Sequence, residues 1–404
     1  MKESRYNFWF KTNDNKKAVY NTFTQALVLL DDIDIDCIHN LKNVDTYKKL
    51  GLLIEDNVNE LDIIKYDIFK TNSNDGNAFR ILTTTACNAK CPYCYEKGIK
   101  TETMTLDMAD KVAKFIEQQS TTNAGITLEW FGGEPLVNPS VISVITRKLK
   151  NDGYIIKSAA LTTNGILFTD ELIEVAKTEW QLTNVQITLD GVNEIHDAVK
   201  GVEGCFAQVC DNIDRLAKNS IDVSVRMNVS LSNIAEIQKL IEFLAKRFIS
   251  HEHIYFYLFP MFNEMEAAPR ELMLNIIKLN KKLYDMRLIG KKVYHFYYHS
   301  AGCVHATRRG YTIAPNGNLY NCSHTINTGL TIGSVSDFSN YNPERLRFLQ
   351  LTTDPKCEEC VFLPICGSGC RVGALKQDQM YKCFIYKNVF TDVLKQAIDE
   401  EWDV

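Results

Sequence analysis

The sequence predicts an α/β fold built around a parallel sheet. Short apolar runs alternate with amphipathic stretches of helical length from about residue 79 onward, which is the pattern of βαβ units. Six such units fit between residues 76 and 268. Hydrophobic residues make up 45% and charged residues 24% of the 404, the balance of an ordinary folded protein. Periodicity alone leaves open whether the sheet is doubly wound or forms a partial barrel.

Each expected strand is a short apolar run, and each expected helix carries apolar residues at helical spacing. The strands are expected at residues 78–83, 126–131, 158–162, 185–189, 223–229 and 254–259. The helices are expected at residues 106–118, 139–149, 170–176, 206–216 and 233–246.

The segments on either side of this core have a different pattern. Residues 1–75 predict a small α+β domain, with a hairpin over 6–19 and helices over 26–30 and 47–52. Residues 269–299 predict a helical bridge. Residues 300–404 form a cysteine-rich segment that ends in a helix over 386–398, and they are too poor in hydrophobic residues to build a large core alone. Such a domain usually needs a metal to hold it together.

Composition excludes several classes of protein. The 45 Lys and Arg residues against 50 Asp and Glu give a net charge of -5, which argues against a nucleic-acid binder that works through bulk charge. No apolar run approaches the roughly 18 residues that cross a bilayer. The first residues lack the apolar stretch of a secretory signal. We therefore expect a cytoplasmic protein with neither a membrane nor a nucleic-acid partner.

Thirteen cysteines are many for a reducing compartment, where disulfides seldom persist. They are also clustered: three lie between residues 87 and 94, and seven lie between residues 303 and 383. Clustered thiols in such a chain indicate metal binding. The three isolated ones are expected to be buried structural thiols: Cys37, Cys205 and Cys210.

The first cysteine group follows the first expected strand of the core. Cys87, Cys91 and Cys94 have the spacing C-x3-C-x2-C, which lets three thiolates reach one four-iron cluster and leaves one iron open. An open coordination position is typical of a metal centre that performs chemistry. The alternative is a structural zinc with a distant fourth ligand.

A second motif supports the catalytic interpretation. Gly132-Gly133-Glu134 ends the second expected strand, where glycine backbone allows a close approach by a ligand. Taken alone, a Gly-Gly pair is an ordinary strand-to-helix turn.

Together the two motifs resemble the radical SAM superfamily. The resemblance implies a partial (β/α)6 TIM-like barrel and a [4Fe-4S] cluster on the three thiolates. It also implies S-adenosyl-L-methionine bound at the open iron, and a 5′-deoxyadenosyl radical after one-electron reduction. By the same resemblance, Tyr93 contacts the adenine, the Gly132-Gly133-Glu134 segment contacts the methionine end, and Thr188 lies near the cofactor.

One position departs from related peptide-modifying members. They carry an arginine twelve residues after the hydroxyl residue, where this chain has Lys200. Lysine pairs with a carboxylate as a point charge but lacks the planar two-pronged geometry of arginine. Either Arg226, on the fifth expected strand of the core, supplies that geometry, or the cofactor is held more loosely.

The second cysteine group resembles the SPASM domain. Zinc ribbons use two C-x2-C pairs, and only one is present here. The resemblance implies two auxiliary [4Fe-4S] clusters, the nearer on Cys303, Cys322 and Cys370. The remaining four thiols would hold the distal cluster: Cys357, Cys360, Cys366 and Cys383. The fourth position of the nearer cluster is filled by His305 or water, or is open to a substrate thiolate.

The resemblance implies an enzyme that modifies a ribosomally made peptide with a leader, supplied with electrons by a flavodoxin or ferredoxin. Our first hypothesis is thioether formation between a peptide carbon and a cysteine sulfur. Formylglycine formation in a sulfatase, carbon–carbon cross-linking and epimerisation are alternatives, as is a non-catalytic iron–sulfur protein. Residues 1–75 resemble a winged-helix leader-binding module, or else form a structural cap. No acid or base is assigned.

Overall fold

The computed structural model divides into two compact units, which are described separately. The described residues are 1–42, 44–72, 77–94, 96–121, 124–248, 252–261, 269–290, 309–349, 355–372 and 386–402. The first unit comprises Met1–Asn74, Gly290–Cys303 and Leu351–Val404. The second comprises Asp75–Ile289 and Val304–Gln350.

The second unit contains an eight-stranded sheet in the order β11-β10-β9-β8-β7-β6-β12-β13. Strands β6 to β11 are parallel neighbours in sequence order, so all six strands expected from the sequence are confirmed. The chain runs outward from β6 to β11 and then returns to add β12 on the other side of β6. The bounds are β6 Asn77–Thr84, β7 Ile126–Gly132, β8 Ile156–Thr163, β9 Asn184–Leu189, β10 Asp222–Val229, β11 Ile254–Pro260, β12 Gly310–Ile313 and β13 Leu319–Tyr320.

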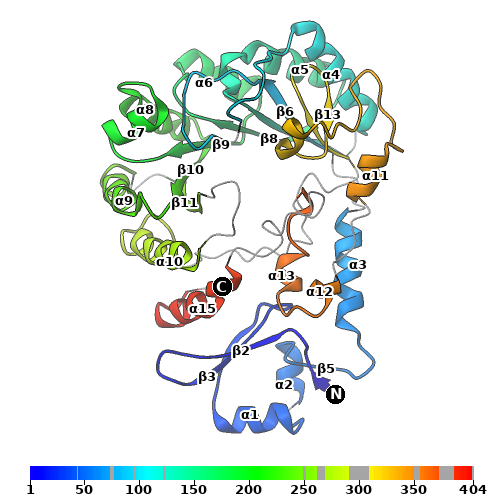
Figure 1. Ribbon diagram of the computed structural model, residues 1–404, viewed down its shortest axis with the longest axis vertical. Helices are drawn as coiled ribbons and strands as arrows, with labels where there is room; N and C mark the ends of the chain where they lie inside the picture. Colours follow the sequence, from blue (N-terminus) through cyan, green and yellow to red (C-terminus); the bar gives the residue numbers. More distant parts are fainter. Residues whose placement is uncertain are drawn as a thin grey trace. The chain divides into compact units, whose positions relative to one another are not determined.

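Helices follow the strands and lie along the outer side of the sheet (Figure 1). The expected helices are confirmed, including the bridging one, and the sequence pattern missed the short helix α7. The bounds are α4 Leu106–Gln119, α5 Pro139–Asn151, α6 Asp170–Thr178, α7 Glu194–Lys200, α8 Cys205–Lys218, α9 Ile234–Phe248, α10 Arg270–Asp285 and α11 Pro343–Leu349, with 3-10 turns η1 Pro135–Val137 and η4 Ser323–Thr328.

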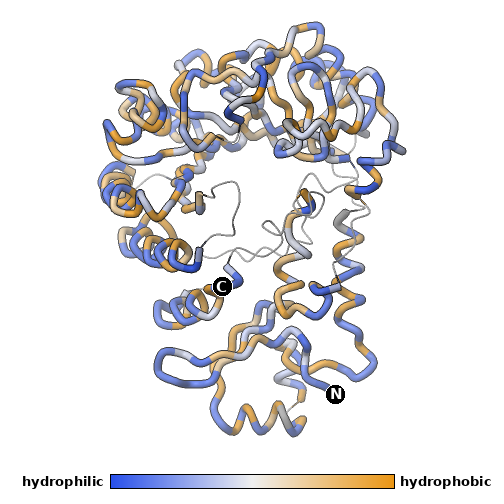
Figure 2. The backbone as a smooth tube through the Cα atoms, in the orientation of Figure 1, coloured by the Kyte–Doolittle hydropathy of each residue, from blue (hydrophilic) through white to orange (hydrophobic). Residues whose placement is uncertain are grey.

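The two faces of this sheet differ in chemistry. Along β9 the buried side chains Val185, Ile187 and Leu189 alternate with half-buried polar ones, and β10 repeats the pattern. Because successive side chains of a strand point to opposite faces, one face is apolar and the other polar. The helices bury the apolar face with their own apolar stripes, and Figure 2 shows hydrophobic and hydrophilic residues mixed along α9 and α10.

Strand β12 brings part of the cysteine-rich segment into this sheet. It pairs in parallel with β6, and the ring of Tyr311 stacks on Phe79 with centroids 5.8 Å apart. Phe115 and Phe338 meet the same tyrosine edge to face. Residues 309–349 therefore fold with the core, although the sequence assigned them to a domain at 300–404. The four-domain division stays a prediction.

The first unit contains a three-stranded antiparallel sheet in the order β2-β3-β4. The expected hairpin is confirmed, but the expected helix over 26–30 is wrong, because Leu27–Leu30 forms β4 and pairs with β3. The Asn21 side chain accepts hydrogen bonds from the backbone N–H groups of Phe23 and Thr24 in the turn before β4. The bounds are β1 Lys2–Glu3, β2 Asn7–Lys11, β3 Lys17–Asn21, β4 Leu27–Leu30, β5 Leu53–Ile54, α1 Asp32–His39, α2 Val44–Lys49 and α3 Glu60–Asn72.

The C-terminal segment completes this unit. The ring of Phe8 lies 5.3 Å from both Phe362 and Phe390, and Arg5 donates to the carbonyl oxygen of Glu358 at 2.7 Å. The N-terminal strands and the C-terminal cysteines thus share one core. The expected terminal helix is confirmed as α15. The bounds are α12 Pro355–Glu358, α13 Leu363–Cys366, η6 Lys387–Val389 and α15 Phe390–Asp399.

None of the described helices has the length and apolar character needed to cross a bilayer.

Tyr311→Ala tests whether β12 is part of the core. The Tyr311 side chain is buried among three aromatic rings, so we expect the free energy of unfolding of this unit to fall by about 3–5 kcal/mol. Chemical denaturation followed by circular dichroism measures the change. Tyr341→Ala is the control, because Tyr341 is 82% exposed, and its effect should stay below about 0.5 kcal/mol. Equal denaturation midpoints for Tyr311→Ala and Tyr341→Ala would contradict the packing of β12 against the core.

Candidate functional site

The first cysteine group lies in the loop that follows β6, at the carboxyl end of the parallel strands. Ligands of parallel α/β sheets bind at this end. Cys87 is exposed, and Cys91 and Cys94 are half-buried; none of them is in a disulfide. Burial raises the pKa of the Cys87 and Cys94 thiols. All three sulfurs come from one short loop, as the spacing predicts.

Two glycines dock this loop against the end of β7. A Cβ at Gly132 would lie 2.1 Å from the carbonyl oxygen of Thr84, and one at Gly133 would lie 2.4 Å from that of Ala86. Gly132 also has a φ of 131°, which residues with a side chain rarely adopt. The N–H of Gly133 donates to Thr84 at 3.0 Å. The glycines are therefore required by the approach of the cysteine loop itself, whatever else they contact.

Glu134 braces the same junction from inside the protein. Its N–H donates to the carbonyl oxygen of Ala86 at 2.9 Å, and its side chain is fully buried. The carboxylate accepts from the hydroxyl of Thr163 and from the backbone N–H groups of Asn164 and Leu136. Burial raises the pKa of this carboxyl group, and these three donors oppose the rise. Glu134 thus links the ends of β7 and β8.

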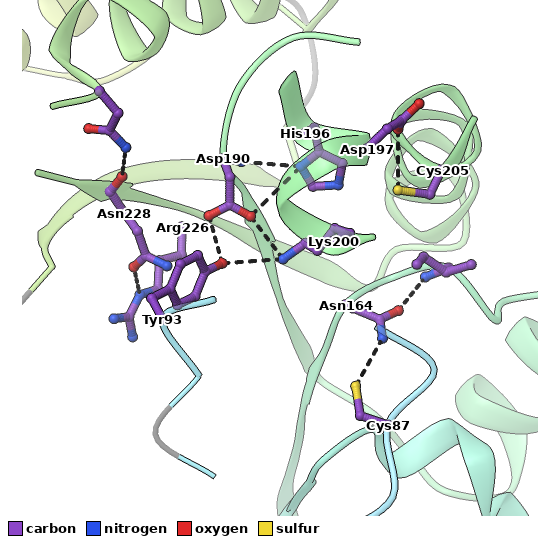
Figure 3. A network of polar contacts seen from close by, with 12 residues as sticks. Cys87, Tyr93, Asn164, Asp190, His196, Asp197, Lys200, Cys205, Arg226 and Asn228 are labelled. Atoms are coloured by element: carbon purple, nitrogen blue, oxygen red, sulfur yellow. Dashed lines mark hydrogen bonds and ion pairs between the residues drawn. The ribbon is translucent and has the colours of Figure 1, made fainter. Parts of the chain in front are cut away.

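Asn164 contacts the cysteine loop directly, and the sequence analysis did not select it. Its amide donates to the side-chain oxygen of Asn88 at 2.6 Å. The same amide lies 3.9 Å from the sulfur of Cys87 (Figure 3). Its position directly after β8 was the available signal, because polar residues at the ends of parallel strands gather at one edge of the sheet.

On the other side, a buried ion pair holds the end of the cysteine loop (Figure 3). The ammonium group of Lys200 lies 2.9 Å from the carboxylate of Asp190, and both side chains are 3% exposed. The hydroxyl of Tyr93 donates to the same carboxylate at 2.7 Å. The carbonyl oxygen of Lys200 also accepts from the N–H of Lys90 at 2.7 Å. The ammonium group of Lys200 also donates to the Tyr93 hydroxyl at 3.5 Å. Two contacts from Lys200 of α7 and one from Asp190, directly after β9, therefore fix residues 90–93.

The protonation states in this network follow from its geometry. Burial opposes the charged form of Lys200, but the Asp190 carboxylate raises the pKa of its ammonium group above the ordinary value. Burial also raises the pKa of the Tyr93 hydroxyl, which keeps its proton. His196 is fully buried, and its Nδ1 accepts from the N–H of Asp190 at 3.2 Å. Burial, followed by the charge of Lys200, lowers the pKa of His196 to about 4.

Thr188 and Arg226 lie side by side on the polar face of the sheet, as register partners in β9 and β10. The Nε of Arg226 donates to Asn228 at 2.8 Å, and its guanidinium lies 4.0 Å from the centre of the Phe259 ring. The structure therefore places Lys200 in an internal ion pair, whereas Arg226 presents its planar group from a half-buried position.

The C-terminal cysteines divide between the two units. Cys322 is buried in the sheet unit, where it directly precedes η4. The other described thiols of this group lie in the first unit around α12 and α13, and none is in a disulfide: Cys357, Cys360, Cys366 and Cys370. Cys303, Cys383 and His305 lie outside the described residues. The expected cluster assignments therefore stay predictions.

The three thiols of the first group suit an iron–sulfur cluster in chemistry, since such a cluster needs soft sulfur ligands, and all three come from one docked loop. Among the residues that the structure describes, no three His, Cys, Asp or Glu side chains are already gathered around a metal position. Behind the loop, the carboxylates of Glu134 and Asp190 bind neighbouring side chains, and the backbones of Glu134 and Lys200 bind the loop backbone.

Sequence comparison identifies the family. The model of the radical SAM superfamily matches residues 81–244, which include both motifs. GTP 3′,8-cyclase of Clostridium perfringens (strain SM101 / Type A) is 30% identical over 229 residues, covering 53% of this chain and 67% of the relative. The chain belongs to the radical SAM superfamily.

Other radical SAM relatives match different lengths of the chain. The subtilosin biosynthesis protein AlbA of Bacillus subtilis (strain 168) is 35% identical over 172 residues, covering 41% of this chain and 37% of AlbA. The serine-type anaerobic sulfatase-maturating enzyme of Klebsiella aerogenes is 23% identical over 346 residues, covering 76% of this chain and 83% of that enzyme. The first relatives are thus matched over only part of their length.

Two solved structures share the radical SAM fold. The structure of anSMEcpe with bound AdoMet and Cp18Cys peptide has a TM-score of 0.61 at 17% identity, covering 80% of this chain and 97% of that one. Streptococcus suis SuiB bound to precursor peptide SuiA has a TM-score of 0.55 at 15% identity, covering 96% and 99%. At these identities the likeness shows the fold alone.

Gly132→Ala tests the docking of the cysteine loop. The added Cβ would collide with the Thr84 carbonyl oxygen, so we expect the first-loop cluster to be lost from reconstituted protein. Electron paramagnetic resonance of the reduced protein, with and without S-adenosyl-L-methionine, measures that cluster. Gly153→Ala is the matched control, since Gly153 also has a positive φ but no atom within 4 Å of its Cβ position. An unchanged cofactor-dependent signal in Gly132→Ala would refute the docking role.

The lowered pKa of His196 predicts that the folded protein loses stability in mild acid. Its pKa is about 4 in the fold against 6.5 in an unfolded chain, so its neutral form stabilises the fold above pH 6.5. This contribution is lost as the pH falls from 6.5 to 4, by about 3 kcal/mol in total. Denaturation of the wild type and of His196→Gln across this range measures the difference. Parallel pH profiles would show that His196 is not held neutral.

Proposed function

We propose that this chain is a radical SAM/SPASM peptide maturase that joins a carbon of a ribosomally made peptide to a cysteine sulfur. The observation that carries the proposal is the seven-cysteine group at residues 303–383, which accompanies a complete first loop. Seven thiols complete one four-iron cluster and three positions of a second. No cysteine lies between Cys303 and Cys322, so the nearer cluster has a position for a substrate thiolate.

In this proposal Cys87, Cys91 and Cys94 hold the first cluster, and the sequential parallel strands form a partial (β/α)6 barrel beneath it. When bound, the clusters and S-adenosyl-L-methionine supply one electron, a 5′-deoxyadenosyl radical that takes a hydrogen atom, and an acceptor for the electron released later. The chain's own residues fix the position of the cysteine loop. The backbone of Gly132 and Gly133 packs against one side of the loop, and Tyr93 anchors the other side through its hydrogen bond to Asp190.

The remaining contacts of the cofactor are proposed from the sequence motifs and from which charged side chain is not already in an internal ion pair. Tyr93, the Gly132-Gly133-Glu134 segment and Thr188 stay the proposed contacts of the cofactor. Lys200 is committed to Asp190, so we assign the cofactor carboxylate to Arg226, whose planar group supplies the two-pronged contact that a lysine lacks.

The auxiliary clusters keep the ligands expected from the sequence. Cys303, Cys322 and Cys370 hold the nearer one in this proposal. Cys357, Cys360, Cys366 and Cys383 hold the distal one. The turn at residues 357–370 suits this role, because Cys360 donates its N–H to Cys357 and closes the C-x2-C pair into a tight loop.

The reaction balances without a further reagent. For each link a C–H bond and an S–H bond of the peptide break, and one C–S bond forms. Each link would consume one S-adenosyl-L-methionine, which leaves as methionine and as 5′-deoxyadenosine carrying the abstracted hydrogen atom, and the thiol proton would leave to solvent. One electron would be consumed in cleaving the cofactor, and one electron would be released when the C–S bond forms. Because the two cancel, an external flavodoxin or ferredoxin is needed only to prime the enzyme.

The first unit offers a place for a leader peptide. Strands β2 and β4 are the outer strands of its three-stranded sheet, and an extended peptide can add to such an edge through backbone hydrogen bonds. Two comparisons support a peptide substrate: AlbA is a subtilosin biosynthesis protein, and SuiB has been solved with its precursor peptide.

Formylglycine formation is a second candidate. It is favoured by the length of the match to the sulfatase-maturating enzyme, which covers 83% of that relative against 37% of AlbA. The absent cysteine between Cys303 and Cys322 favours thioether formation.

Product mass separates these functions. Reconstituted enzyme is incubated with reductant, S-adenosyl-L-methionine and either a cysteine-rich precursor peptide or a cysteine- or serine-containing sulfatase peptide. We expect the precursor to lose two hydrogens and one free thiol for each link. Conversion of the sulfatase peptide to an aldehyde would establish the second candidate instead. Release of 5′-deoxyadenosine with both peptides unchanged in mass would reject both.

A further inference from the structure

Two arginines hold the residues on either side of Cys322. The residue before it, Asn321, accepts a hydrogen bond from Arg345 at 2.8 Å. The residue after it, Ser323, accepts one from Arg80 at 2.9 Å. Nothing in the cysteine spacing predicts this arrangement, and the first cysteine group does not take part in it.

Arg80 connects this position to the polar face of the parallel sheet. It lies on β6, and its Nε and one terminal nitrogen bind both carboxylate oxygens of Glu129 on β7, at 2.9 and 2.7 Å. The other terminal nitrogen reaches the hydroxyl of Ser323. Only arginine has three donors in one rigid plane, so a lysine at this position would keep the charge and lose the geometry.

Arg345 connects the same segment to the aromatic core. Its side chain is 1% exposed, and its guanidinium lies 4.7 Å from the centre of the Tyr311 ring. The carbonyl oxygen of Cys322 accepts from both the N–H and the hydroxyl of Thr325, which closes the turn. The backbone around Cys322 is therefore fixed from both sides.

We propose that Arg80 is a positioning residue for Cys322, which it acts on through Ser323, and that the Arg80–Glu129 pair thereby sets the geometry of the auxiliary cluster that Cys322 ligates. This inference rests on the proposed function, which makes Cys322 a ligand. Groups that orient metal ligands from behind typically change metal affinity about 10–100-fold when they are removed. The sheet that carries the first cysteine loop would then also position one thiolate of the second group.

The test uses the full chain with Cys87, Cys91 and Cys94 replaced by alanine, so that only the auxiliary clusters remain. Ser323→Ala removes the hydroxyl that Arg80 binds and leaves the Arg80–Glu129 pair intact. After reconstitution we expect iron loss to a chelator to be at least about tenfold faster than in the parent, with an altered electron paramagnetic resonance spectrum. Ser323→Thr restores the hydroxyl and should restore both readouts.

Arg80→Lys should reproduce the effect of Ser323→Ala. Arg247→Lys is its matched control, since Arg247 also pairs with two carboxylates, Asp211 and Asp214, but does so on the outer helices. Circular dichroism confirms that each variant is folded. Parent-like iron release and spectra in Ser323→Ala and Arg80→Lys would overturn the positioning role. A parent without iron would instead overturn the auxiliary clusters of the proposed function, and this inference with them.

Discussion

The position of the first three thiols depends on a close contact between two backbone segments, one after β6 and one at the end of β7, with no side chain between them. The carbonyl oxygens of Thr84 and Ala86 occupy the space that a Cβ at Gly132 or Gly133 would need. Hydrogen bonds from Gly133 and Glu134 close the same contact. The cysteine loop is therefore an extension of the β6–β7 pairing and takes its rigidity from the sheet.

The polar groups around this contact balance one another inside the protein. Glu134 is satisfied by three donors, and Asp190 is shared between Lys200 and Tyr93. Burying such charges is unfavourable unless they are paired and hydrogen-bonded. The cysteine loop is therefore fixed at residues 84–86 and at residues 90–93. Cys87 lies between these two anchored parts and is exposed. A reactive centre that must hold a small cofactor benefits from such prior ordering.

The core strands could be predicted because their apolar runs are long and regularly spaced between helices. Residues 26–30 could not be assigned correctly, because a short apolar run suits a helix or a strand equally well until pairing with β3 decides. The thiols of the first loop were recognisable from spacing. Asn164, Asp190 and His196 were not, because a single polar residue gains meaning only once the topology brings strand ends together.

The two units are each assembled from distant parts of the chain, and this has a consequence for biogenesis. During translation the parallel sheet stays incomplete until residues 310–313 have emerged to pair with β6. The aromatic cluster of Phe8 waits longer, until Phe390 has left the ribosome. Another apolar core of this unit needs only residues 19–53, so the N-terminal strands can pack one part of their surface early and the Phe8 part only later. We expect a nascent N-terminal segment to leave the Phe8 aromatic cluster exposed to solvent until residue 390 has been added.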